Sequence, residues 1–330
     1  MGTTRWICVG LASILLNGAA VGADPPEKKG LAMEAANAFL QVFGDHSGFR
    51  LAHAKGIVVT GTFEPTPAAA ELSKAAHFKS GPIQVVARFS DGTGFPQIPD
   101  GDPHGNPKGF AIRFNLPNGE NTDIVANGLN GFVAGTPEDF VGFISAVAAT
   151  KPDSPRPTPL ENFLGSHPAS LKYVTQPNPT PASFATQAFF GNNAFVFVNA
   201  DGKKQAFRYQ IVPVAGEEHL EAEEAAKKPA DFLMDEIRER IKKTPVEFRL
   251  IAQLANSDDP ASDATKVWPD DRKKVELGTI KLTAVDPKSD QTQKELEFTP
   301  TNLTDGIQLS DDPLPAFRAK VYRISVEHRQ

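Results

Sequence analysis

Cysteine is nearly absent from this chain of 330 residues. The single cysteine, Cys8, lies in an apolar N-terminal segment, so the chain without that segment has no thiol. Disulfides, zinc–thiolate sites, iron–sulfur clusters and cysteine nucleophiles are then excluded. Tyrosine and tryptophan are also scarce, with three and two residues against 23 phenylalanines. This aromatic balance predicts a dry interior in which each tyrosine has a specific place.

The chain has neither an excess of positive charge nor a hydrophobic run that spans a bilayer comfortably. With 34 lysines and arginines against 40 aspartates and glutamates, it lacks the basic surface that nucleic-acid backbones require, so we expect no nucleic-acid partner. The apolar run from Ile7 to Ala20 is followed by Val21-Gly22-Ala23, small residues that are typical of a signal-peptidase site. We therefore expect a signal peptide over residues 1–23, a mature domain over residues 24–330 without a membrane span, and a periplasmic or secreted location. Retention of the segment as an N-terminal anchor is the alternative.

Hydrophobic periodicity and turn residues predict a single α+β domain. Strand-like runs occupy Gly56–Phe63, Ile83–Ser90, Gly109–Asn115, Thr122–Val125, Phe195–Asn199, Gln205–Val212, Val246–Leu254 and Val275–Ala284. Helical spacing occurs over Leu31–Phe43, Thr136–Ala149, Pro229–Lys243 and Asp312–His328. We expect an antiparallel β-barrel with flanking helices. Because generic nucleotide, zinc-hydrolase and serine-hydrolase motifs are absent, these patterns alone indicate no more than an apolar ligand.

Six short motifs that occur in order along the chain carry more information. They are Arg50-Leu51-Ala52-His53-Ala54-Lys55-Gly56 with Gly61–Thr66, Val86–Ser90, Asn106–Ala111, Asp123–Asn127, Thr265–Pro269, and Asp305-Gly306-Ile307 with Arg318 and Tyr322. Each resembles a segment of the haem catalases, in the same order, over roughly residues 31–330. The chain is much shorter than a typical catalase, and it is most similar to the minimal, secreted branch of catalase-related peroxidases. The resemblance implies haem b buried between the barrel and the C-terminal helix.

The resemblance makes Tyr322 the ligand of the haem iron. Arg318 precedes it by four residues on the expected final helix, so both side chains lie on one face. A guanidinium that donates to the phenolate would stabilise its charged form. An exposed Arg–Tyr pair on a terminal helix is the alternative. Tyr173 and Tyr209 have no such partner in the sequence, and we expect both to be structural.

On the opposite side of the haem, the resemblance assigns catalytic roles to His53, Asn127 and Ser90. An imidazole can move a proton between the two oxygens of a peroxide, and a carboxamide can hold the peroxide by hydrogen bonds. Ser90 would orient the imidazole from behind. A satisfied core histidine is the alternative for His53. Asn130 is the alternative to Asn127, because the sequence after Asn127 departs from the family pattern.

The two haem propionates require buried cations, and the resemblance implies Arg50, Arg88 and Arg329. For each the alternative is a surface charge, most of all for Arg329, the penultimate residue. Several apolar side chains, among them Ala52, Phe132 and Phe140, are candidates to pack against the macrocycle. The histidines without a matched role are expected at the surface: His46, His77, His104, His167 and His219.

Three departures from the family pattern bear on function. Lys108 replaces an arginine, Arg323-Ile324-Ser325 follows Tyr322 where another tripeptide is usual, and the sequence ends at Gln330 without the C-terminal domain of large catalases. We therefore expect no bound NADPH, a more open haem pocket, and a peroxidase that reduces hydrogen peroxide or organic hydroperoxides with a small organic electron donor. Weak catalase activity is expected, and a homo-oligomer is compatible with the sequence. The alternatives are a true catalase, a hydroperoxide isomerase and a non-enzymatic haem carrier.

Overall fold

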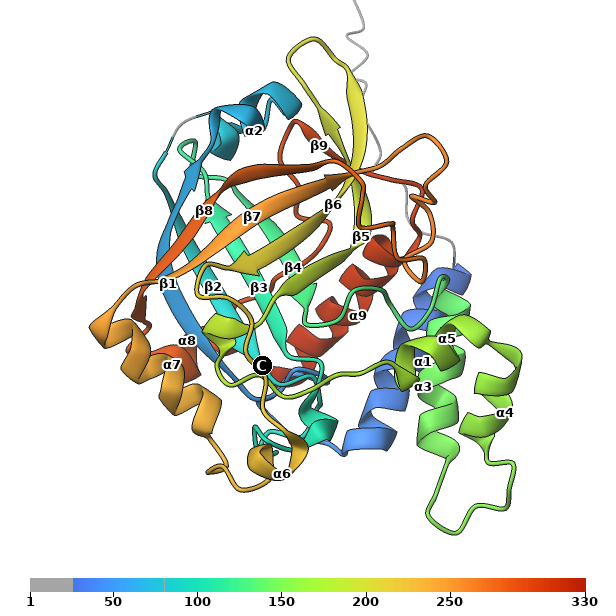
Figure 1. Cartoon of the computed structure of the whole chain (residues 1–330). Helices are drawn as coiled ribbons and strands as arrows, with labels where there is room; N and C mark the ends of the chain where they lie inside the picture. The colour runs from blue at the N-terminus through green and yellow to red at the C-terminus, as the bar shows by residue number, and fades with distance from the viewer. Residues whose placement is uncertain (1–25, 80) are drawn as a thin grey trace, which may run out of the picture.

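A computed structural model describes residues 26–79 and 81–330, so the predicted signal peptide lies outside the described residues. Nine strands form one antiparallel sheet in the order β4-β3-β2-β1-β8-β7-β6-β5-β9. Their bounds are β1 Gly56–Pro65, β2 Ile83–Ser90, β3 Gly109–Asn115, β4 Asn121–Asn127, β5 Phe189–Val198, β6 Lys204–Pro213, β7 Val246–Leu254, β8 Lys274–Val285 and β9 Ile307–Leu309. A further pairing of β4 with β5 closes the first eight into a barrel (Figure 1). The predicted α+β class with an antiparallel barrel is confirmed.

One row of paired residues marks the end of the barrel at which the predicted site residues gather. Gly56 of β1 pairs with Ser90 of β2, and Ser90 pairs with Gly109 of β3. Gly109 in turn pairs with Asn127 of β4, which pairs with Phe190 of β5. Segments that lie up to 134 residues apart in sequence therefore meet in a single cross-section, where the barrel closes.

The helices lie outside the barrel. The α-helices are α1 Pro26–Phe43, α2 Pro67–Leu72, α3 Pro137–Ala149, α4 Pro159–Ser166, α5 Pro168–Thr175, α6 Ala222–Ala225, α7 Phe232–Lys243, α8 Ser289–Glu295 and α9 Leu314–Arg329. Helix α1 packs against α3 and α9, and α3 packs against α4. Figure 1 shows these helices grouped on one side of the barrel, with α9 running between the group and the strands. Among the described residues, no helix has the length and apolar character needed to cross a membrane.

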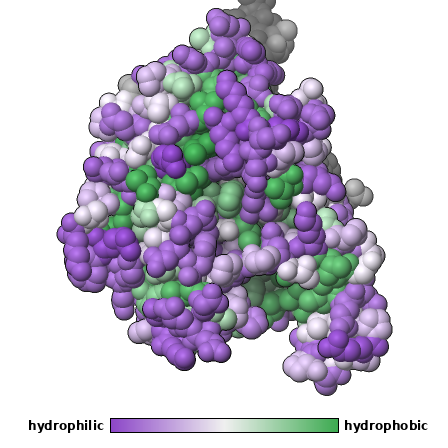
Figure 2. Space-filling model, viewed as in Figure 1, coloured by the Kyte–Doolittle hydropathy of each residue, from purple (hydrophilic) through white to green (hydrophobic). Residues whose placement is uncertain are grey.

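Two apolar cores hold the parts together. The larger fills the barrel with stacked phenylalanines, such as Phe89 against Phe110 at 4.3 Å between ring centroids. The smaller joins α1, α3 and α9, and includes Val141 and Phe317. Hydrophilic residues cover most of the face in Figure 2, while hydrophobic residues show over the group of α1, α3 and α5. The phenylalanine-rich interior is the one that the composition predicts.

Several local predictions differ from the structure. Strand β5 begins at Phe189, six residues before its predicted start, because polar Asn192 and Asn193 interrupt the apolar run at a bulge. His77 is wrong as a surface residue: it is 1% exposed and lies in the barrel beside Phe78 and Phe114, where burial lowers its pKa to about 3. A neutral imidazole fits among aromatic rings, and nothing in the local sequence distinguishes that position.

Candidate functional site

A cavity of about 340 Å³ lies between the end of the barrel and helices α1, α3 and α9. This volume is within the usual range of small-molecule sites. Every residue predicted to hold or act on haem lines it: Arg50, His53, Arg88, Ser90, Asn127, Arg318, Tyr322 and Arg329. Asn130 is not among the lining residues, so of the two candidate carboxamides only Asn127 reaches the cavity. Phenylalanines from α1, α3 and α9 line much of the remaining wall.

The barrel wall of the cavity carries His53 and Ser90. A hydrogen bond of 3.1 Å joins Nδ1 of His53 to Oγ of Ser90, and the backbone of His53 is left-handed with φ 56°. Such a backbone is costly for a residue with a Cβ and persists only where its surroundings hold it. Gly109 lies against this pair, since a Cβ there would come within 2.6 Å of Ser90 Oγ and 2.7 Å of His53 Nδ1. The close approach of strand β3 therefore requires glycine at this position.

The charge state of His53 follows from its surroundings. Burial lowers its pKa to about 3, and the positive charges of Arg88, Arg318 and Arg50 act in the same direction. A backbone hydrogen bond with Asp91 raises it by a smaller amount. The imidazole is therefore neutral near pH 7, with one nitrogen able to accept a proton.

Asn127 is held in place by a second asparagine. Its Oδ1 accepts hydrogen bonds from the backbone N–H of Leu129 at 3.0 Å and from Nδ2 of Asn192 at 3.3 Å. Asn192 also binds the loop that follows, through the N–H of Gly131 and the carbonyl of Leu129. With its oxygen occupied, Asn127 keeps its Nδ2 as a donor for a molecule in the cavity.

The helical wall of the cavity carries Tyr322 and Arg318 on α9. Nε and Nη2 of Arg318 donate to Oη of Tyr322 at 3.1 and 2.7 Å. Nη1 of Arg318 donates to Oδ1 of Asn193, whose Nδ2 donates to Asp312 at 2.8 Å. Asn193 of strand β5 thus holds the guanidinium in place, and two of the guanidinium N–H groups donate to the phenol oxygen. That oxygen therefore receives two hydrogen bonds from one cation.

Three further arginines form a buried cationic cluster. Burial and mutual repulsion lower the pKa of Arg50, that of Arg329 is lowered by burial, and that of Arg88 is lowered to about 9. Their donors are satisfied by neutral oxygens: Arg50 and Arg329 both donate to the carbonyl of Leu296, and Arg88 donates to Gln293. None of the three forms an ion pair with a carboxylate within the described part of the chain, although Glu297 acts on Arg329 and Asp91 on Arg88 through their charge. Three cations without a direct acidic partner favour a bound anion.

The residues present fit haem. The phenol oxygen of Tyr322 with two N–H donors suits a metal ligand on one wall, and the phenylalanines suit a flat apolar macrocycle. The cluster of arginines, none of which is ion-paired with a carboxylate among the described residues, suits the propionates. Among the described residues there is no group of three or more His, Cys, Asp or Glu that could hold a metal ion.

Several residues that contact the site could not be identified from the sequence. Asn192 and Asn193 could be noticed only as polar residues inside an apolar strand, and Gln293 lies in the short helix α8, which no periodicity predicts. Tyr173 was expected to be structural but lines the cavity, where burial raises the pKa of its phenol to about 12. Tyr209 is buried against Phe207 in the barrel, as expected.

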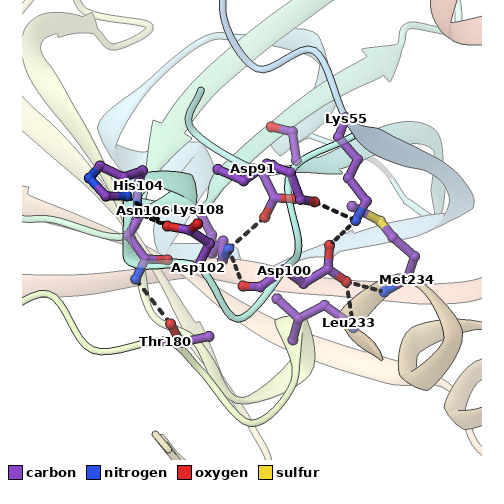
Figure 3. Close-up of polar contacts among 12 residues, drawn as sticks. Lys55, Asp91, Asp100, Asp102, His104, Asn106, Lys108, Thr180, Leu233 and Met234 are labelled. Carbon is purple, nitrogen blue, oxygen red and sulfur yellow. Dashed lines mark hydrogen bonds and ion pairs between the residues drawn. The ribbon is translucent and has the colours of Figure 1, made fainter. Parts of the chain in front are cut away.

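Lys108, noted in the sequence as a departure from the family pattern, has its own buried partners. Figure 3 shows its ammonium between Asp91 and Asp100, with Lys55 on the far side of Asp100. Nζ of Lys108 lies 2.5 Å from Oδ1 of Asp91 and 2.8 Å from the backbone carbonyl of Asp100. Because Asp91 directly follows Ser90, this network begins next to the pair that lines the cavity.

A closed antiparallel barrel, with a phenol from α9 and an imidazole from the barrel end lining one cavity, defines the class of protein to which this chain is similar. The catalase family model matches residues 47–330, and the chain belongs to the catalase family. Proteins of this family generally bind haem.

Two relatives cover nearly the whole chain. A catalase-related peroxidase from Mycolicibacterium paratuberculosis is 37% identical over 87% of this chain and 90% of that protein. A catalase-related peroxidase from Synechococcus elongatus is 32% identical over 98% of this chain and 96% of that protein.

Two solved catalase structures share the fold. A fungal catalase has a TM-score of 0.75 at 22% identity over 86% of this chain, and a bacterial catalase 0.74 at 23% identity over 96%. The chain spans 59% and 63% of the length of these two proteins.

Proposed function

We propose that this protein is a haem peroxidase that reduces hydrogen peroxide or organic hydroperoxides with a small organic electron donor and has weak catalase activity. The observation that carries the proposal is the cavity itself, with Tyr322 and Arg318 on one wall and His53, Ser90 and Asn127 on the other. Haem b is the proposed cofactor, with Tyr322 as the iron ligand and Arg50, Arg88 and Arg329 at the propionates. Bound haem would supply the redox chemistry of peroxide reduction.

The chain's own residues would manage the proton and the peroxide. Neutral His53 would accept a proton from one peroxide oxygen and return it to the other, which departs as water from hydrogen peroxide or as an alcohol from an organic hydroperoxide. Ser90 keeps the ring oriented through its bond to Nδ1. Asn127 donates its free Nδ2 to the peroxide. Arg318 fixes the phenol oxygen of Tyr322 through two hydrogen bonds.

A line of aromatic side chains supports an organic donor. Phe43 lines the cavity, and Phe95 packs edge-on against it at 5.2 Å between centroids. Phe95 is 41% exposed, so an aromatic surface continues from the cavity wall to solvent. Aromatic pairs of this geometry are favourable, which suits the approach of a phenolic or anilinic donor.

The test compares two reactions on one preparation at matched peroxide concentration. Clear oxidation of an aromatic donor together with slow oxygen release supports the proposal. Rapid oxygen release without donor oxidation would assign a true catalase. Rearrangement of an organic hydroperoxide without added reductant would assign an isomerase, and tight haem with negligible turnover would assign a haem carrier.

We also propose that residues 1–23 are a cleaved signal peptide and that the protein is periplasmic or secreted. The apolar run and the small residues Val21-Gly22-Ala23 support this. Intact mass and N-terminal sequencing of protein from the periplasm or medium should place the new terminus at Asp24. A protein that retains residues 1–23 and stays with the membrane fraction would contradict it.

A further inference from the structure

Two buried carboxyl groups, neither of which lines the cavity, lie close to the His53–Ser90 pair, since Asp91 directly follows Ser90. Asp91 and Asp100 are each 0% exposed at the side chain (Figure 3). Oδ1 of Asp91 is paired with Lys108, and Oδ2 of Asp100 accepts the backbone N–H groups of Leu233 and Met234 at the start of α7. Each residue therefore has one oxygen that is well satisfied. The remaining two oxygens decide what the pair can do.

Those two oxygens differ in their partners. Oδ2 of Asp91 is buried and has no hydrogen-bond partner among the described residues. Oδ1 of Asp100 lies 2.6 Å from Nζ of Lys55. That ammonium has three N–H groups for four oxygens, which also include the carbonyls of Ile98 and Ala230 and the carboxylate of Asp231. Oδ1 of Asp100 therefore shares its donor with other oxygens and can accept a second one.

We propose that Asp91 and Asp100 form a carboxyl pair that shares one proton between these two oxygens, and that this proton positions His53. A single proton supplies the donor that Oδ2 of Asp91 lacks. The proposal deepens the proposed function, on which its second half rests.

The connection to His53 runs through backbone. The N–H of Asp91 donates to the carbonyl of Lys55 at 3.1 Å, and a backbone hydrogen bond links Asp91 to His53 itself. Lys55 is two residues after His53, and Asp91 is one after Ser90. Both ends of the His53–Ser90 contact are therefore anchored in the network. Loss of the proton leaves two carboxylates in contact, and their repulsion displaces the strand end that holds the imidazole.

The charged groups facing the pair allow it to titrate in an accessible range. Burial raises the pKa of Asp91 to about 6; Lys108 opposes this, whereas the charge and hydrogen bond of Asp100 add to it. Arg88 of strand β2 also interacts with Asp91, and Asp102, hydrogen-bonded to His104, interacts with Lys108. Asp231, 64% exposed, links Lys55 to solvent and gives a proton a way in.

Infrared spectroscopy of the holoprotein tests the shared proton directly, without reference to activity. A carbonyl band of a buried protonated carboxyl group should be present at pH 5, shift in D₂O, disappear as the pH rises to 7.5, and be missing from Asp91→Asn. Asp102→Asn is the matched control, because it changes a partly exposed carboxylate two residues from Asp100 and should keep the band. Absence of the band from wild-type protein at pH 5 would overturn the proposal even if no variant folds.

The pH profile of peroxide consumption tests the positioning of His53. The second-order rate constant of the wild type should fall about threefold or more between pH 5 and 7.5, because the protonated fraction of a group with this pKa falls by more than that. In Asp91→Asn, whose neutral amide can donate to Asp100, the fall should be absent. Titration of His53 would give the opposite slope, since its neutral form is the active one.

The outcomes of these two tests distinguish a failure of this proposal from a failure of the proposed function. A titrating band with no peroxide turnover at any pH removes the peroxidase and the positioning of its histidine, but leaves the proton-sharing pair in place. A titrating band with an unchanged pH profile in Asp91→Asn overturns the positioning alone. Lys108→Arg, which keeps the cation beside Asp91, should restore the profile that Lys108→Met loses.

Discussion

His53 is the acid–base group that we propose for the reaction, and its ring is held by Ser90 through a hydrogen bond. His53→Ala should retain haem but reduce the rate of peroxide consumption by about 10²–10⁴-fold, the usual contribution of a positioned acid–base group. Stopped-flow kinetics at limiting peroxide measures this. His104→Ala is the control, because that histidine is exposed and its ring binds only Asp102. A wild-type rate in His53→Ala would make His53 a structural residue.

Individual residues divide into those that the sequence identifies and those that only the fold reveals. His53, Ser90, Asn127, Arg318 and Tyr322 stand in short contiguous motifs that resemble the family, and the structure brings them to one cavity. Their supporting residues are different. Asn192, Asn193 and Gln293 contact the site from strands and helices distant in sequence, and no local pattern connects an amide with an arginine 125 or 205 residues away.

Strand β3 approaches the site more closely than any side chain would allow. Gly109→Ala would place a methyl group within 2.6 Å of Ser90 Oγ and 2.7 Å of His53 Nδ1, and both groups are held by the barrel. We expect a loss of about 1–3 kcal/mol in the free energy of unfolding, from overpacking, and a lower turnover with haem retained. Denaturant titration and steady-state kinetics measure the two effects.

Gly165→Ala provides the matched control for that substitution. Gly165 lies in helix α4 with no atom within 4 Å of an added Cβ, so alanine there should stabilise by about 0.5–1 kcal/mol. Turnover should not change. If Gly109→Ala behaved like Gly165→Ala, strand β3 would not set the position of His53.

The elements themselves were largely predictable because alternating apolar residues and Gly- or Pro-rich turns mark the barrel strands. The patterns could not predict that Gly56, Ser90, Gly109 and Asn127 pair across neighbouring strands, because strand pairing depends on the whole sheet. Short helices such as α2 and α8 were missed for a related reason. A helix of six or seven residues has too few turns for a periodic signal and is stabilised by its neighbours.

Across the molecule, the cavity concentrates positive charge: among the described residues it is lined by four arginines, Arg50, Arg88, Arg318 and Arg329, against one acid, Glu297. Arg50, Arg88 and Arg329 cost stability when no anion is present, so the apoprotein should be less stable than the holoprotein. At free haem about 100-fold above its Kd, the expected stabilisation is about 2.7 kcal/mol. Thermal unfolding with and without haem measures it, and Arg88→Met should show a smaller gain. An unchanged Tm on adding haem would mean that the arginines serve another anion.

Haem content and the absorption spectrum of the purified protein, measured beside those of Tyr322→Phe, test the proposed site most directly. The wild type should contain one haem b per chain with a high-spin ferric spectrum typical of phenolate ligation. Tyr322→Phe keeps the ring that packs in the cavity but removes the oxygen that receives both bonds from Arg318, so it should lose haem or bind it far more weakly. Full haem retention with an unchanged spectrum in Tyr322→Phe would contradict the assignment of Tyr322 and the cavity built around it.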